Sequence, residues 1–270
     1  LNGEGLQHGD GQSLLLASAV PNLAAYDPAF AYELAIIVKD GIARMYGDEP
    51  EDVFYYLTLY NENYLMPAMP ESPAGAAAGA VEEGICRGLY RFAARPAPAG
   101  DAGDATGELR PATILFSGTA YLAAKEAQEL LATRHGVAAE LWSATSYKAL
   151  REEALSAERW NRLHPEGTPR VPWVAQQLRA SEGPIVAVTD FMQAVPDQIA
   201  RWVPRGYTVL GTDGYGRSDT RAALRRHFGT DAAQLVVSVL KALADERQAT
   251  AAEVAEAIAA YGIDPDAVEA

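Results

Sequence analysis

The chain has 270 residues, of which 49% are apolar and 21% charged, a profile typical of a globular protein with an ample core. Its formal charge of −14 argues against nucleic acids and anionic membranes as partners, because both are bound through basic patches. The single cysteine, Cys86, excludes an internal disulfide and fits a reducing compartment. No apolar run is long enough for a membrane span and no signal peptide opens the chain, so we expect a cytoplasmic protein.

The first twelve residues, LNGEGLQHGDGQ, combine four glycines with three side chains that can accept or donate a proton, Glu4, His8 and Asp10. The glycines argue against a helix and let the backbone come close to a ligand. Imidazole is the side chain whose unperturbed pKa lies nearest neutral pH, and a neighbouring carboxylate such as Glu4 would favour its protonated form. The pattern indicates an active-site loop, although a histidine that hydrogen-bonds its own backbone is equally compatible with it.

A strand, a helix and a second strand are predicted next. Residues 20–26 form a short buried strand, and a helix follows from Pro28 to about residue 46, with Asp27 as its N-cap and Gly47 as its stop. Residues 53–59 alternate aromatic and aliphatic side chains, which is typical of a strand. This order predicts a parallel α/β unit, whose ligands bind beyond the carboxyl ends of the strands.

Three irregular stretches then divide the chain. The polar residues 61–67 are predicted to form a turn with an interface role. Residues 70–79, PESPAGAAAG, shift toward Ala, Gly and Pro and indicate a domain boundary. Residues 96–107 are interpreted as a hairpin insertion, because they lie between two predicted strands, residues 89–93 and 113–116.

From residue 112 the pattern alternates regularly between strands and helices. Val-rich and Ile-rich strands in this order predict a mostly parallel sheet covered on both faces, that is, a three-layer α/β sandwich. The predicted strands are residues 112–117, 138–143, 185–189 and 207–211, and the predicted helices are residues 121–134, 147–155, 173–178, 193–203, 220–228, 232–244 and 251–261.

The loop GTDGYGRSD, residues 211–219, lies between a predicted strand and a helix, where a glycine-rich loop can bind phosphate. It lacks the dinucleotide-binding spacing and the Walker lysine, so a nucleotide-binding protein is only weakly indicated. We interpret the loop as structural, with Ser218 or Asp219 capping the next helix and with Arg217 and Arg221 as candidates for an interdomain or partner contact. The other three histidines lack the spaced partners of a metal site.

Four stretches carry a resemblance to a known family, in order along the chain: LNGEGLQHGDGQS, PNLAAYDPAFAYELAIIVKDGIARMYG, YNENYLMPAMPE and LGTDGYGRSDTR. They resemble the single-chain, homodimeric pyruvate dehydrogenase, the decarboxylating first component of the pyruvate dehydrogenase complex. Only the C-terminal portion of that family is matched, so we expect a piece of a longer enzyme. The resemblance implies the end of a thiamine-diphosphate-binding, transketolase-like pyrimidine domain at residues 1–70, a linker at 71–84, and a transketolase C-terminal-like three-layer α/β/α domain at 85–270.

The resemblance also implies a function. The family uses thiamine diphosphate and Mg²⁺ to decarboxylate pyruvate and then reductively acetylates a lipoyl group. Its EGLQH segment lies in the active site, so Glu4 and His8 are expected to be catalytic, and His8 and Asp10 to bind substrate. The GDG at residues 9–11 is interpreted as a turn, because no asparagine pair for metal and diphosphate follows it. The cofactor and metal are therefore expected to be bound mainly by parts of the enzyme outside this chain, which alone should be inactive.

The expected partners are a second copy, in a homodimer, and the lipoyl and subunit-binding domains of the dihydrolipoamide acetyltransferase. An alternative from a different class is a noncatalytic dimerisation or complex-assembly module derived from the same family. It is supported by the sequence from about residue 81 onward, which shows no convergent set of catalytic side chains.

Overall fold

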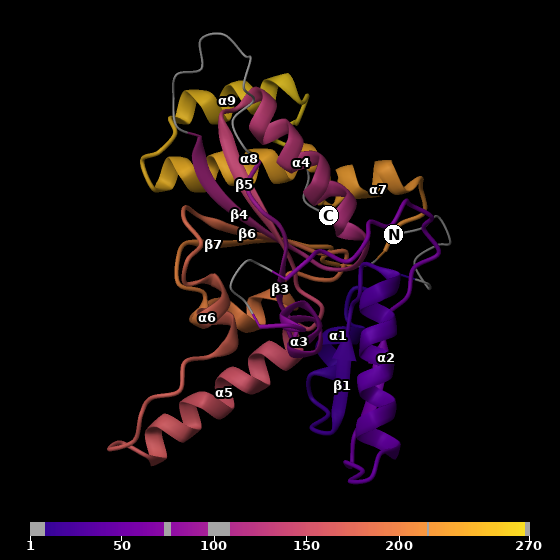
Figure 1. Ribbon diagram of the computed structural model, residues 1–270. Coiled ribbons are helices and arrows are strands. Elements are labelled where there is room, and N and C mark those ends of the chain that lie inside the picture. The colour runs from indigo at the N-terminus through magenta and orange to yellow at the C-terminus, as the bar shows by residue number, and fades with distance from the viewer. Residues whose placement is uncertain (1–8, 73–76, 97–108, 215, 268–270) are drawn as a thin grey trace.

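The computed structural model describes residues 9–72, 77–96, 109–214 and 216–267 (Figure 1). In these ranges the strands form two sheets. A two-stranded parallel sheet contains β1 (Leu23–Tyr26) and β2 (Phe54–Leu57), and a five-stranded sheet has the order β3-β5-β4-β6-β7. No helix within the described ranges is long and apolar enough to cross a membrane.

The smaller sheet confirms the predicted strand, helix and strand. It is preceded by the short helix α1 (Ser13–Ala17), and α2 (Ala31–Tyr46) connects β1 to β2. The two strands pair in parallel from Leu23 opposite Phe54 to Tyr26 opposite Leu57. The first strand is shorter than predicted, because a turn in which the Leu23 N–H bonds the Val20 carbonyl precedes it.

The predicted start of α2 is wrong by three residues. Phe30 rather than Asp27 is the N-cap, and helical geometry begins at Ala31. The cap is supplied from within the helix, because the Glu33 carboxylate accepts the backbone N–H groups of Ala29 at 2.6 Å and Phe30 at 3.1 Å. Asp27 is buried and makes other hydrogen bonds, described below, so it is not available to cap α2.

The larger sheet is parallel except at one edge. Strands β4, β5 and β6 are almost completely buried, as expected for parallel strands covered on both faces. The exception is the edge strand β3, which pairs antiparallel with β5, so that β5 lies between β3 and β4. Strands β3 and β4, which flank residues 96–107 in the sequence, are therefore not neighbours in the sheet. Residues 97–107 of the predicted hairpin insertion lie outside the described residues. The strands are β3 (Tyr90–Ala93), β4 (Arg110–Phe116), β5 (Val137–Ser143), β6 (Ile185–Val188) and β7 (Tyr207–Leu210).

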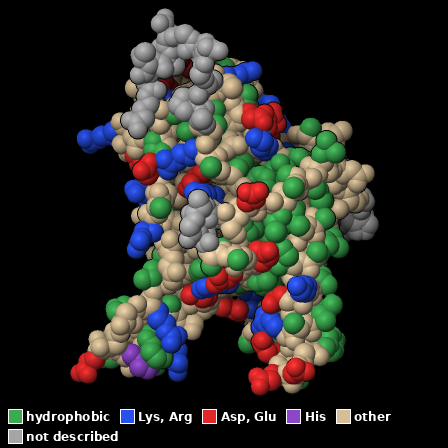
Figure 2. Space-filling model, viewed as in Figure 1, with side chains coloured by type: hydrophobic (Ala, Val, Ile, Leu, Met, Phe, Trp, Pro, Cys, Tyr) green, Lys and Arg blue, Asp and Glu red, His purple; other side chains and the backbone are tan. Residues whose placement is uncertain are grey.

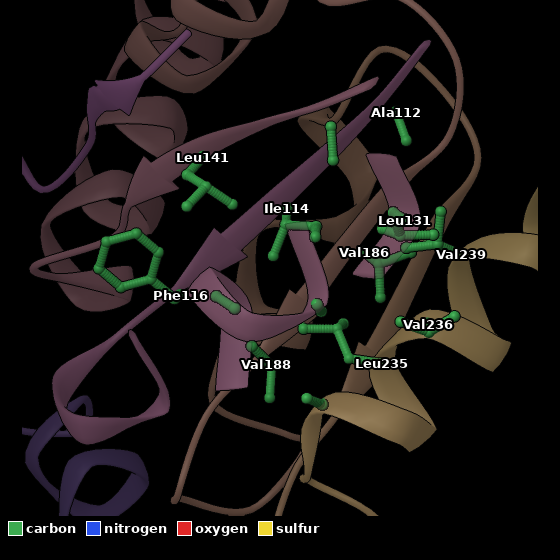
Figure 3. Packing of buried hydrophobic residues seen from close by; sticks show 14 of the residues in the cluster. Ala112, Ile114, Phe116, Leu131, Leu141, Val186, Val188, Leu235, Val236 and Val239 are labelled. Atoms are coloured by element: carbon green, nitrogen blue, oxygen red, sulfur yellow. The ribbon is translucent and has the colours of Figure 1, made fainter. Parts of the chain in front are cut away.

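Helices cover both faces of this sheet and make the predicted three layers (Figure 1). One face carries α4 (Tyr121–Arg134), α8 (Ala232–Asp245) and α9 (Ala251–Ala260), and the other carries α5 (Tyr147–Leu163) and α6 (Trp173–Leu178) with a 3-10 helix, Pro196–Trp202. Figure 3 shows how Ile114, Phe116, Val186 and Val188 of the strands meet the helices on the first face. The 3-10 helix stands where an α-helix was predicted at residues 193–203, and α5 extends eight residues beyond its predicted end at residue 155.

A buried carboxylate joins the part of the chain that contains the smaller sheet to the part that contains the larger sheet. The Glu33 side chain of α2 accepts hydrogen bonds from Ser143 Oγ of β5 at 2.6 Å and from Tyr90 Oη of β3 at 2.7 Å. Burial raises the pKa of Glu33 to about 7, against the lowering effect of these hydrogen bonds. Helix α3 (Ala80–Arg87) spans the end of the predicted linker and packs near α2 through Val81 and Ile85. The domain boundaries at residues 70 and 85 stay a prediction.

Candidate active site

The carboxyl ends of strands from both sheets meet at one junction. Asp27 directly follows β1, and the backbone N–H of Gly118, just after β4, donates to the Asp27 carbonyl at 3.2 Å. A Cβ added at Gly118, which has a φ of +49°, would lie 2.6 Å from the Tyr60 hydroxyl. Parallel α/β folds bind ligands beyond such strand ends, so this junction is where the fold predicts function.

Asp27 is a buried carboxylate at the centre of the junction. Its Oδ1 accepts hydrogen bonds from Thr58 Oγ1 at 2.6 Å and from Tyr60 Oη at 2.7 Å. Burial raises its pKa to about 6. Its Oδ2 has no partner among the described residues, and the same holds for Tyr147 Oη and Gln198 Oε1, which line a cavity of about 10 Å³ with it. Such a polar space has room for about one water molecule.

A partly buried ion-pair cluster lies beside this carboxylate. Arg225 of α7 (Arg221–His227) donates to both oxygens of Glu62, at 3.0 and 2.6 Å, and lies 3.6 Å from Asp190 after β6. The Thr119 hydroxyl also donates to Asp190. A bidentate arginine pair of this kind is charge-assisted and fixed in geometry. It connects the segment after β2 to the larger sheet.

Arg221 adds a second contact between the same two parts, because its Nη2 donates to Asn61 Oδ1 at 2.7 Å. This contact within the chain agrees with the interdomain alternative predicted for Arg221. The interface role predicted for residues 61–67 concerns the contact between subunits and stays a prediction. Arg217 is exposed. The predicted helix caps Ser218 and Asp219 are wrong: Thr220 is the N-cap, and its Oγ1 accepts the Ala223 N–H at 3.3 Å.

Two of the residues predicted to be catalytic, Glu4 and His8, lie outside the described residues, so their roles stay a prediction. Asp10 is exposed and lies just before α1. Its Oδ1 accepts the backbone N–H groups of Gln12 at 3.1 Å and Ser13 at 2.9 Å, and its Oδ2 accepts the Ser13 hydroxyl at 2.5 Å. The carboxylate thus fixes the start of α1, and its predicted binding of substrate stays untested.

The segment of residues 9–12 rests on two loops at the carboxyl edge of the larger sheet. The Met192 N–H, in the loop after β6, donates to the Gly11 carbonyl at 2.9 Å. Gln12 Nε2 donates to the Gly214 carbonyl, in the loop after β7, at 3.1 Å. A Cβ added at Gly216 would lie 2.7 Å from Gly9 Cα. The loop of residues 211–219, interpreted from the sequence as structural, therefore contacts the segment that the resemblance assigns to the active site.

The described residues offer neither a cluster of metal ligands for Mg²⁺ nor an open glycine-rich loop for a diphosphate. The part of the chain that the structure describes contains no group of three His, Cys, Asp or Glu side chains able to hold a metal ion. The glycine-rich loop after β7 is filled by protein: Cβ atoms added at Gly211 and Gly216 would each lie 2.7 Å from backbone atoms, of Gln193 and Gly9 respectively. No phosphate cradle remains there.

A second hollow, of about 280 Å³, lies between β1, α3 and α5. Its three cationic side chains, Arg44, Arg87 and Lys148, each form an ion pair with a glutamate. Cys86 lines it too, and burial raises the pKa of this thiol to about 11, which keeps it protonated near neutral pH. With its charges compensated and its thiol protonated, this hollow is a weaker candidate than the strand junction.

The sequence prediction missed four members of the junction. Asp27 was assigned to a helix cap, and Glu62, Asp190 and Arg225 were given no individual role. One signal could have found the two aspartates, because each follows a predicted buried strand directly. Nothing local marks the pairing of Glu62 with Arg225, which are 163 residues apart.

Comparisons with known proteins agree with this architecture. A family model described as the pyruvate dehydrogenase E1 component middle domain matches residues 1–67, and one described as the transketolase-like C-terminal domain matches residues 103–231. The pyruvate dehydrogenase E1 component of Pseudomonas aeruginosa is 45% identical over 267 residues, and that of Escherichia coli K12 is 44% identical over 269. This chain resembles the C-terminal portion of a pyruvate dehydrogenase E1 component. The alignments cover 98% and 99% of the chain but 28% of each E1 component.

Two solved transketolase structures are similar to this chain in fold, which is the transketolase-like fold that the resemblance implies. A transketolase from Leishmania mexicana matches with a TM-score of 0.57 and 14% identity, over 90% of this chain and 28% of its own. A structure described as a split gene transketolase, inactive beta4 tetramer, matches with a TM-score of 0.58 and 19% identity, over 89% of this chain and 64% of its own. At such identities the likeness concerns the fold alone, and the predicted transketolase-like α/β fold is confirmed.

Proposed function

We propose that this chain is part of a thiamine-diphosphate-dependent pyruvate dehydrogenase, which decarboxylates pyruvate and reductively acetylates the lipoyl group of an acyltransferase component. The observation that carries the proposal is the 44–45% identity to E1 components over nearly the whole chain. A second supporting observation is the position of residues 9–12 at the carboxyl edge of a parallel sheet, where α/β enzymes bind their ligands. The single cysteine suits a cytoplasmic location.

Within this proposal the chain contributes orientation and proton transfer. His8 hydrogen-bonds the pyruvate carboxylate and moves a proton during acetylation of the lipoyl group, Glu4 orients His8, and Asp10 lies beside the bound substrate. Thiamine diphosphate supplies the carbanion chemistry when bound. Because the described residues do not fit the diphosphate or Mg²⁺, we assign both groups mainly to those parts of the E1 component that this chain does not span.

The test is the release of CO₂ from pyruvate with thiamine diphosphate and Mg²⁺. The 270-residue chain is compared with an assembly that also contains the upstream portion of the E1 component. We expect activity only in the assembly. Activity in the chain alone would contradict our assignment of the cofactor site, and activity in neither would favour the noncatalytic assembly module.

A His8→Ala variant of the assembly tests the role of the imidazole. Loss of a general acid or base typically lowers turnover by about 10²–10⁴-fold, and we expect a loss in that range. His164→Ala is the matched control, because His164 ends α5 and stacks on Trp160 at a ring distance of 3.6 Å. Normal turnover in the His8→Ala variant would remove His8 from the mechanism.

The proposed partners are a second copy of the protein and the lipoyl and subunit-binding domains of the dihydrolipoamide acetyltransferase. Self-association is supported by apolar side chains that α2 and the segment after β2 expose, and hydrophobic side chains gather over α2 in Figure 2. The exposed residues include Val38, Ile42, Tyr46, Leu65 and Met66. Analytical ultracentrifugation of the assembly gives its copy number, and a mass corresponding to one copy would contradict the homodimer.

A further inference from the structure

Residues 9–12 depend on neighbours distant in sequence for their position. This segment precedes α1 and belongs to no helix or strand. Its contacts with the larger sheet are made through main-chain atoms of Gly9 and Gly11 and through the side chain of Gln12. A Cβ added at Gly11 would lie 2.9 Å from the Thr212 carbonyl, so the segment and the loop after β7 are in tight backbone contact.

The two loops that receive the segment are linked to one another. The Thr212 N–H donates to the Phe191 carbonyl at 2.8 Å, and the Phe191 N–H donates to Thr189 Oγ1 at 3.2 Å. Phe191 and Thr212 are buried. At Gly211, an added Cβ would meet backbone atoms of the opposite loop at 2.7 Å, which leaves no room for the loops to approach further. We call the two loops, held together by these backbone contacts, the platform.

The platform is anchored by the partly buried ion-pair cluster. Asp190, in the loop after β6, lies within 3.6 Å of Arg225 on the helix that follows the other loop. Arg225 in turn holds Glu62 from the smaller part of the chain. The cluster of Asp190, Arg225 and Glu62 therefore connects three elements. These are the loop after β6, the helix that follows the loop after β7, and the segment after β2.

Asp10, proposed to lie beside the bound substrate, stands between Gly9 and Gly11, so a displacement of these glycines moves its carboxylate as well, because consecutive Cα atoms are about 3.8 Å apart across a trans peptide. Misplacing a reacting group by about 1 Å can lower a rate by about 10²-fold. We propose that the loops after β6 and β7, in the C-terminal part of the chain, position residues 9–12, which carry Asp10 and directly follow Glu4 and His8 in the sequence. Gly216 is a positioning residue in this arrangement. The inference rests on the proposed function and gives the C-terminal part a role in catalysis besides assembly.

The test is a Gly216→Ala variant of the active assembly. The new methyl group would lie 2.7 Å from Gly9 Cα, so the segment or the loop must shift. The structure gives Gly216 no left-handed φ, so alanine should not strain its own backbone. Gly206→Ala is the control, since its Cβ would meet only the flexible Glu246 side chain, at 3.5 Å.

We expect Gly216→Ala to lower kcat at least 10-fold, to change KM for pyruvate less than 3-fold, and to leave the unfolding midpoint close to that of Gly206→Ala. Its pH profile of kcat should also shift, which a purely structural defect would not cause. A kcat within 2-fold of the control would overturn the inference. An inactive parent assembly would instead overturn the proposed function, so the two failures are distinct.

A second variant tests the positioning of residues 9–12 by the platform if Gly216→Ala does not fold. Gln12→Leu removes the hydrogen bond to the Gly214 carbonyl without adding bulk to the platform. We expect a smaller loss of kcat, about 3-fold or more, with an unchanged unfolding midpoint. Unchanged kcat in Gln12→Leu would count against the platform as the element that positions the segment.

Discussion

Glu33 gives the sharpest test of the packing between the two parts of the chain. Its pKa is raised by burial from 4.5 to about 7. A raised pKa means that the folded protein holds the proton more tightly, so the contribution of Glu33 to stability is complete below about pH 4.5 and is lost as the pH rises through 7. At roughly 1.4 kcal/mol per pH unit, the loss is about 3 kcal/mol.

Glu33→Gln cannot ionise and should escape this loss. A glutamine can keep its oxygen toward the backbone N–H groups of Ala29 and Phe30, while its amide donates to the hydroxyls of Ser143 and Tyr90, which can rotate to accept. We therefore expect the free energy of unfolding of the original protein, relative to Glu33→Gln, to fall by about 3 kcal/mol between pH 4.5 and pH 8.

The assay is equilibrium unfolding in urea at several pH values, followed by tryptophan fluorescence. Glu49→Gln is the matched control, because Glu49 is an exposed carboxylate in the loop after α2 and should leave the pH dependence unchanged. If the original protein and Glu33→Gln change in parallel with pH, the carboxylate is not titrating in the folded state as described, and the reasoning fails.

Two further variants test the strand junction. Arg225→Met removes the bidentate partner of the partly buried Glu62 carboxylate, which keeps Arg221 at 3.6 Å, and we expect a loss of about 1–3 kcal/mol in urea unfolding. The loss should be reduced when Glu62→Gln is added, and equal losses in the single and double variants would show that the pair is not the cause. Gly118→Ala places a methyl group 2.6 Å from the Tyr60 hydroxyl, whereas Gly136→Ala, also at positive φ, meets nothing within 4 Å. Thermal unfolding should show the Gly118 variant to be less stable by at least about 1 kcal/mol than the Gly136 variant, and equal midpoints would contradict the close contact.

Elements with a strong local pattern were predicted from the sequence almost to the residue. The bounds of α4 and α6 coincide with the predicted ones, because the residues that delimit them, such as Gly136 after α4 and Pro172 before α6, are local signals. The start of α2 was wrong because Asp27 has two competing uses, a helix cap or a buried acceptor. The second depends on Thr58 and Tyr60, about 30 residues away.

The pairing of strands was less accessible than their existence. The sequence indicates a strand at β3 but not that it pairs with β5 instead of with the next strand along the chain. The carboxyl ends of parallel strands were the predicted place of function, and the buried polar side chains lie there. Their partners were not predictable, because Arg225 and Glu62 meet only once both parts of the chain are folded and packed. The roles of Glu4, His8 and Asp10 still rest on the resemblance.

The bond between Glu33 and Ser143 also constrains the order of events on the ribosome. Its two partners are 110 residues apart, so at about 5–20 residues per second the chain grows for roughly 5–20 s after Glu33 is made before Ser143 exists. Until β5 is made, β3 also lacks its neighbouring strand. Apolar side chains that the finished fold buries are then exposed together with the exposed apolar side chains of α2. Until translation has passed β5, the nascent N-terminal part therefore leaves exposed the edge of β3 that β5 covers in the finished fold.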